Sequence, residues 1–309
     1  GGGSRRPILG VVFDVGGVLT ESPLLQVERF ETARGLPRGF AAAALASPAP
    51  DGGPSVFSRL ERGELRPGPE AGSALAAQFN SNAALEKFLR RRAQRAQVVS
   101  GGGSVAKIAA AEPQEPETAA AVASAVASAA VDGRACMELL ASLGRAASVP
   151  VEELRAVVRE AHGAGLKVVA LSNDMLDFGL GLDSETEAGE GAHSPSAGGD
   201  LGSSEWVEGL PFRQVLRSSV LGHRKPEPQA YQAALEALGL SDPELEALRA
   251  GRARVLMVDD LDANLRGGEL HCGLEPFKVD LVEEPPVLVA RRLRFALGLA
   301  QGPALPSKL

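Results

Sequence analysis

Three apolar segments of strand length, each ending abruptly in polar residues, constrain the fold of this 309-residue chain more than any other feature. They are Ile8–Phe13, Leu166–Leu171 and Arg254–Val258, and a weaker fourth segment covers Arg213–Leu216 with its flanks. The three are rich in β-branched residues and almost continuously apolar. Strands that are buried on both faces of a parallel sheet have this pattern.

Amphipathic helical patterns lie between these strands. Val151–His162 follows Pro150 and places its apolar residues on one face, and Pro228–Leu238 does the same before Gly239. Alternation of strands and helices predicts an α/β fold with a doubly wound, Rossmann-like parallel sheet. In such sheets, ligands bind at the carboxyl ends of the strands.

The stretch between the first two strong strands has a different character. Residues 22–150 contain helical patterns and no convincing strand, which predicts a helical domain inserted into a core formed by 1–21 and 151–309. Within it, residues 97–131 are of low complexity and rich in alanine, so they can hold an Ala-rich helix. Residues 183–205 have almost no large apolar side chain, which predicts a disordered insertion in the core.

Composition excludes several classes of protein. The net charge of −7 and the pI near 5.3 argue against a broad nucleic-acid-binding surface. No apolar run reaches the roughly 18–20 residues of a membrane span. The two cysteines, Cys136 and Cys272, cannot build a disulfide framework or a Cys-rich metal site, and they fit a reducing compartment.

The segment VVFDVGGVLT places Asp14 at the carboxyl end of the first strand. Gly16 and Gly17 allow the backbone to turn tightly and to approach a ligand. A carboxylate in this position can act as a nucleophile or as a metal ligand. The alternative is a strand-end aspartate that caps a turn.

Three further strand ends carry polar groups. Ser172 and Asn173 follow the second strand, and they can donate hydrogen bonds to an anion or cap a helix. Lys225, just before a proline, can neutralise a phosphoryl oxygen or lie on the surface. Asp259 and Asp260 end the last strand, and two adjacent carboxylates repel each other unless a cation compensates them. Mg²⁺ prefers such oxygen ligands, whereas a solvated acidic turn needs no cation.

Taken together, the four segments resemble the haloacid dehalogenase superfamily of hydrolases. The matching motifs are Asp14 with Gly17-Val18-Leu19, Ser172-Asn173, Lys225-Pro226, and Asp259-Asp260 with Asn264. The sequence around Gly16-Gly17-Val18 and Arg224–Glu227 is similar to one branch in particular. That branch contains the N-terminal phosphatase domain of soluble epoxide hydrolase and the related domain fused to some acyl-CoA dehydrogenases. The resemblance covers residues 8–21 and about 150–275, and it is weaker over the helical insertion.

This resemblance implies a Mg²⁺-dependent phosphatase that acts on a small phosphorylated metabolite or a lipid phosphate. Asp14 would attack phosphorus and become an aspartyl phosphate. Ser172 and Asn173 would hold the phosphoryl oxygens, and Lys225 would stabilise the charge of Asp14 and of the transferred group. The inserted helices would form a cap that closes over the substrate.

The same resemblance implies a metal site. Asp260 would ligate Mg²⁺ together with Asp14 and the backbone carbonyl of Gly16. Asp259 would complete this site by supporting Lys225 or the water shell of the metal.

Gly16 departs from the phosphatase pattern, in which this position is a second aspartate that protonates the leaving oxygen and then activates water. General acid–base help is worth roughly 10²–10⁴ in rate. One interpretation is a phosphatase whose proton comes from water, from a cap residue or from Glu21. Others are hydrolysis of an acyl phosphate or a halide, whose leaving group needs no proton, and a catalytically silent phosphate- or partner-binding domain. The dehalogenase branch typically works without Mg²⁺, so the paired Asp259 and Asp260 favour metal-dependent phosphoryl chemistry.

The sequence ends in Ser307-Lys308-Leu309, a tripeptide that the peroxisomal import receptor reads. If Leu309 is the true terminus, this predicts a peroxisomal protein, with a cytoplasmic one as the alternative.

Overall fold

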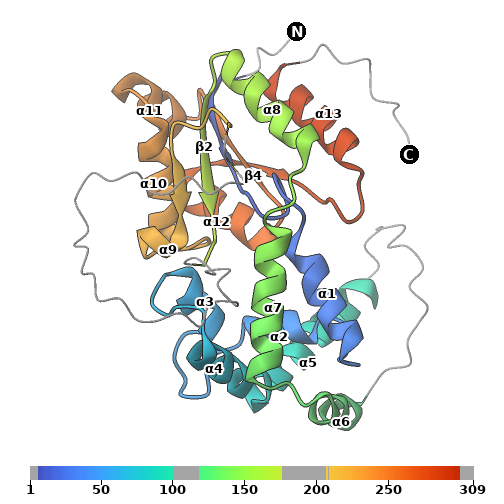
Figure 1. The fold of residues 1–309 in the computed structure, drawn as a ribbon. Coiled ribbons are helices and arrows are strands. Elements are labelled where there is room, and N and C mark those ends of the chain that lie inside the picture. Colours follow the sequence, from blue (N-terminus) through green and yellow to red (C-terminus); the bar gives the residue numbers. More distant parts are fainter. Residues whose placement is uncertain (1–5, 101–117, 176–206, 208, 300–309) are drawn as a thin grey trace, which may run out of the picture. The chain divides into compact units, whose positions relative to one another are not determined.

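The computed structural model describes residues 6–100, 118–175, 207 and 209–299 (Figure 1). The predicted disordered insertion at 183–205, part of the low-complexity stretch at 97–131 and the tripeptide at 307–309 lie outside these residues. Their predicted roles, including the peroxisomal localisation, stay predictions. Over the described residues, no helix combines the length and the apolar character that crossing a membrane requires.

The chain forms two compact units. One contains Gly1–Ser22, Gly144–Asn173 and Asp177–Leu309, and the other contains Pro23–Leu143 with Asp174–Leu176. The first unit holds all the candidate catalytic, phosphate-binding and metal-binding residues. The assignment of the second unit as a cap stays a prediction.

The first unit contains a parallel sheet of five strands in the order β3-β2-β1-β4-β5. The strands are β1 (Ile8–Phe13), β2 (Lys167–Ser172), β3 (Val215–Arg217), β4 (Arg254–Asp259) and β5 (Glu275–Lys278). The three strongly apolar segments thus form β1, β2 and β4 at the predicted places. The prediction of an α/β fold with a parallel sheet is confirmed.

Helices cover both faces of this sheet (Figure 1). On one face, α8 (Glu152–Gly163) and α13 (Pro286–Leu297) share a core with Val11 and Phe13 of β1. On the other face, α10 (Pro228–Leu238) and α12 (Asp262–Cys272) share a core with Val12. Because successive residues of β1 enter opposite cores, all of them are apolar. The short helices α9 (Ser218–Leu221) and α11 (Asp242–Arg249) belong to the same unit.

The described secondary structure of the second unit is helical. Its helices are α1 (Pro23–Ala33), α2 (Phe40–Leu45), α3 (Val56–Glu61), α4 (Pro69–Phe79), α5 (Asn82–Ser100), α6 (Ala119–Ala129) and α7 (Gly133–Ala146). The Ala-rich stretch does hold a helix, α6, which begins at a Thr118 cap. The core of this unit contains edge-to-face pairs of Phe40 with Phe79 and with Phe88.

Candidate active site

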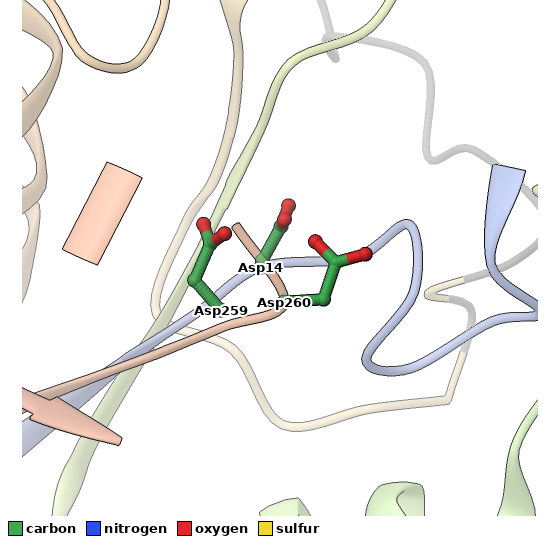
Figure 2. A group of neighbouring side chains, drawn as sticks. All are labelled: Asp14, Asp259 and Asp260. Carbon is green, nitrogen blue, oxygen red and sulfur yellow. The ribbon is translucent and has the colours of Figure 1, made fainter. Parts of the chain in front are cut away.

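Three carboxylates meet where β1 and β4 end. The two strands are neighbours, with Phe13 opposite Val258, and the Asp14 amide continues the ladder by donating to the Val258 carbonyl at 2.8 Å. Asp259 ends β4 and Asp260 follows it. Figure 2 shows the side chains of Asp14, Asp259 and Asp260 side by side, and one oxygen from each lies within 4.8 Å of the others. The expected convergence at the carboxyl edge of the sheet is therefore present.

The turn after β1 brings its backbone against Asp260. The Val15 carbonyl accepts hydrogen bonds from Leu19 and Thr20, and Gly17 has a φ of 80°, in the left-handed region. A Cβ atom on Gly17 would overlap with Oδ2 of Asp260. Glycine at this position therefore meets two requirements, the backbone conformation and the close approach to a carboxylate.

Replacing Gly17 by alanine is expected to destabilise the fold and to displace Asp260. The left-handed conformation alone costs a residue with a Cβ about 1–2 kcal/mol in free energy of unfolding. Gly165 is a matched control, because its φ is 85° and nothing lies within 4 Å of its virtual Cβ. Denaturant unfolding should show a larger loss for Gly17→Ala than for Gly165→Ala. Equal losses would mean that the contact with Asp260 costs nothing.

Lys225 lies fully buried between two of these carboxylates. Its ammonium Nζ is 2.7 Å from Oδ1 of Asp14 and 2.8 Å from Oδ2 of Asp259. Asn173 fixes the backbone of Lys225: its Nδ2 donates to the Lys225 carbonyl at 2.9 Å, and its Oδ1 accepts from the Lys225 amide at 2.8 Å. Asn173 thus holds the backbone that carries the buried ammonium, and a buried ion pair is tolerated only when its geometry is well fixed.

The electrostatics of the cluster favour a cation. Burial, followed by the charge of Asp259, raises the pKa of Asp14 well above its usual range, although Lys225 acts in the opposite direction. Burial and the charge of Asp259 likewise raise the pKa of Asp260 to about 7. Burial alone would lower the pKa of Lys225, but the charges of Asp14 and Asp259 leave it raised. When all three carboxylates are ionised they outnumber the single ammonium, and a bound cation would compensate the remaining negative charge.

Asp259 is occupied by donors of the protein. Its Oδ1 accepts from the Leu261 amide at 2.8 Å and from Nδ2 of Asn264 at 3.0 Å, and its Oδ2 accepts from Lys225 and from the same Nδ2 at 3.1 Å. A carboxylate has about four lone-pair directions. Of the two roles expected for Asp259, these contacts favour support of Lys225 over a place in the metal site. Asp14 and Asp260 then remain as the side-chain candidates for metal binding.

The other predicted site residues lie at the same edge of the sheet. Ser172 is buried at the end of β2. Both ends of the Asn173 amide are engaged by Lys225, so its observed part is to position that lysine, and a phosphate contact through it stays a prediction. Gly16 pairs with Thr20 in an isolated bridge and offers no proton donor, and its carbonyl as a metal ligand stays a prediction. Sequence reasoning missed the partner of Asn264, the hydroxyl of Tyr231, because no spacing rule connects the two.

Comparison with known proteins places this site in a family. Residues 8–271 match the model of the haloacid dehalogenase-like hydrolases. A search of curated proteins gives no match. The branch near soluble epoxide hydrolase stays a prediction.

Among solved structures, a haloacid dehalogenase family enzyme from Bacteroides thetaiotaomicron, in complex with magnesium and inorganic phosphate, is 15% identical, covers 91% of this chain and 98% of its own, and has a TM-score of 0.40. A predicted hydrolase of the same family from Porphyromonas gingivalis is 16% identical, with coverages of 93% and 97% and a TM-score of 0.43. An L-2-haloacid dehalogenase is also 16% identical, with coverages of 94% and 99% and a TM-score of 0.43. TM-scores this low do not by themselves establish a shared fold. The family model, however, spans most of the chain and every strand that ends in a candidate residue, so the chain belongs to the haloacid dehalogenase-like hydrolase family.

Proposed function

We propose that this hydrolase is a Mg²⁺-dependent phosphatase that forms a covalent aspartyl phosphate on Asp14. The observation that carries the proposal is the buried Lys225 ammonium, which is held between Asp14 and Asp259. A carboxylate oxygen of Asp260 lies within 4.8 Å of an oxygen of each of these two aspartates. The substrate class is a small phosphorylated metabolite or a lipid phosphate. A panel of phosphate esters, assayed for phosphate release with Mg²⁺ present, tests the proposal. Release from at least one ester supports it, and a panel without turnover contradicts it.

Asp14 is held in place by two donors. Its Oδ1 accepts hydrogen bonds from Lys225 and from the Val15 amide, each at 2.7 Å. One oxygen of Asp14 would attack phosphorus while the bond from phosphorus to the leaving oxygen breaks, and the other would face the metal ion. Water then hydrolyses the aspartyl phosphate and regenerates the carboxylate. Splitting the hydrolysis in this way lowers the barrier of each step.

The donor set of the site fits Mg²⁺. Carboxylate oxygens are the ligands that this ion prefers, and the excess negative charge of the cluster is of the sign that a cation would compensate. Asp14 and Asp260 would hold the ion, with the carbonyl of Gly16. When bound, the ion would supply positive charge for the phosphoryl oxygens, which adds to that of Lys225.

Stabilisation of the protein by Mg²⁺ is expected to increase with pH. The pKa of Asp260 is raised from 3.8 to about 7, so the folded protein without metal holds this proton more tightly than the unfolded chain does. The protonated Asp260 therefore contributes stability that is fully present below pH 3.8 and is lost as the pH rises through about 7. Binding of Mg²⁺ requires the carboxylate form, which is present above this range. The thermal shift caused by Mg²⁺ should be larger at about pH 8 than at about pH 5.5. An equal shift at both values would argue against Asp260 as a ligand.

Gly16 favours a second candidate function, a phosphate-binding domain without turnover. With glycine at this position, the leaving oxygen must take its proton from water or from another residue. Binding of inorganic phosphate without hydrolysis of any ester would support this second function. Hydrolysis restricted to acyl phosphates, whose leaving group needs no proton, would instead support the chemistry on Asp14.

A further inference from the structure

A run of buried hydrogen bonds leads from the Lys225 ammonium into α12. Asp259 accepts from Lys225 at 2.8 Å, and the Asn264 amide donates to both oxygens of Asp259, at 3.0 and 3.1 Å. Asp259 is completely buried and Asn264 is 3% exposed. Water therefore cannot readily replace a lost donor here, and an unpaired polar atom at such depth is costly.

Tyr231 binds the backbone of Asn264. The Tyr231 hydroxyl donates to the backbone carbonyl of Asn264 at 2.7 Å, and the tyrosine is fully buried in α10. Burial, followed by the charges of Asp259 and Asp14, raises the pKa of Tyr231 above its usual range. The phenol thus stays protonated and acts as a donor.

Glycine in α12 permits this arrangement. A Cβ atom on Gly267 would lie 2.7 Å from the Tyr231 hydroxyl oxygen and 2.8 Å from Cβ of Pro226, the residue after Lys225. On Gly268 it would lie 3.3 Å from Leu274. The helix therefore packs directly on Tyr231 and on the segment that carries Lys225, although glycine lowers helix stability.

These contacts fix the direction in which Lys225 points. An ammonium has three donors, and two of them are engaged by Asp14 and Asp259. With both oxygens of Asp259 held by Asn264 and Leu261, the carboxylate cannot rotate toward a neighbouring cation without breaking hydrogen bonds. Because the ammonium is tetrahedral, fixing two of its N–H bonds also fixes the direction of the third, which is left for the substrate.

We propose that Asn264 is a positioning residue that acts through Asp259 to orient the Lys225 ammonium toward the transferred phosphoryl group. This inference rests on the proposed function for its catalytic consequence, but not for its structural part. In this proposal, Asn264 contributes to catalysis by orienting Lys225 and not by supporting the metal ion.

The structural part is tested by NMR of the lysine side-chain ammonium groups in the full-length protein, with the Lys225 signal assigned by its loss in Lys225→Met. In Asn264→Ala, this signal is expected to shift and to exchange with water faster. Asn80→Ala is the matched control, because the Asn80 amide also donates two hydrogen bonds, at 2.8 Å to the carbonyls of Ala76 and Val131. The control should leave the Lys225 signal unchanged. An unchanged signal in Asn264→Ala would overturn the proposal whether or not the protein hydrolyses any ester.

The catalytic part is tested on a phosphate ester that the wild type hydrolyses. Asn264→Ala is expected to lower kcat about 10- to 100-fold, with KM and the half-saturating Mg²⁺ concentration changed less than about twofold. Tyr231→Phe keeps the ring and removes only the hydroxyl, so it should lower kcat less, again with little change in KM or in the Mg²⁺ requirement. This variant replaces Asn264→Ala in the test if Asn264→Ala does not fold. A raised Mg²⁺ requirement at unchanged kcat would overturn the proposal. Absence of turnover in the wild type would contradict the proposed function, while the NMR result would still decide the positioning role.

Discussion

An Asp14→Asn variant is expected to lose phosphatase activity by roughly 10³-fold or more, because an amide cannot form the covalent intermediate. The substitution is nearly isosteric, and the amide oxygen can still accept hydrogen bonds from Lys225 and the Val15 amide. It also removes one of three crowded carboxylates, whose burial and mutual repulsion disfavour the charged form. The variant should therefore fold at least as stably as the wild type. Release of a chromogenic aryl alcohol in the presence of Mg²⁺ measures the loss.

Asp51→Asn is a suitable control for that experiment. Asp51 is exposed in the other unit, where it accepts a hydrogen bond from the Gly53 amide at 2.9 Å. Its substitution should leave the rate within about twofold of the wild type, as expected for the substitution of an exposed residue. Equal rates in the wild type and in Asp14→Asn would show that the hydrolysis does not proceed through Asp14.

A Gly16→Asp variant is expected to hydrolyse phosphate esters faster, by roughly 10²–10⁴-fold if the missing acid limits the rate. Of the two adjacent glycines, only Gly17 has its φ in the left-handed region, so the backbone at Gly16 accepts a side chain without that strain. The gain should be larger for an alkyl phosphate than for an aryl phosphate, because an alkoxide leaving group needs the proton more. Comparison of kcat on both esters measures this difference.

Gly16→Asn separates acid catalysis from a change of shape. Asparagine has nearly the volume of aspartate but cannot donate and recover a proton in the same way, so this variant should show no gain. If Gly16→Asp hydrolyses neither ester faster than the wild type, the proton transfer that Gly16 cannot provide is not what limits the rate.

The sequence predicted those strands that are buried on both faces, because their residues are almost all apolar. The strands β1, β2 and β4 enter a core on each face, so nearly every residue is apolar and the pattern is unambiguous. By contrast, β5 (Glu275–Lys278) reads EPFK, lies at the edge of the sheet and is only partly buried. An edge strand tolerates a proline and charges that a central strand would exclude, so composition does not distinguish it from a loop.

The candidate site divides in a similar way. Asp14, Lys225, Asp259 and Asp260 could be brought together in advance, because the carboxyl ends of parallel strands meet at one edge and the order of the motifs resembles a known family. The part of Asn173 in holding the backbone of Lys225 could not be foreseen. The same applies to the hydrogen bond from Tyr231 to the backbone carbonyl of Asn264, which depends on how α10 and α12 pack. A side chain that binds the backbone of a distant segment leaves no spacing in the sequence by which to recognise it.

The most direct test of the central claim is a crystal structure of the protein with Mg²⁺ and beryllofluoride, which imitates a phosphoryl group on a carboxylate. The proposed function predicts beryllium bound to an oxygen of Asp14, the ion between Asp14 and Asp260, and the Lys225 ammonium within hydrogen-bond distance of a fluoride. Beryllofluoride bound elsewhere, or a metal ion that contacts neither Asp14 nor Asp260, would contradict it.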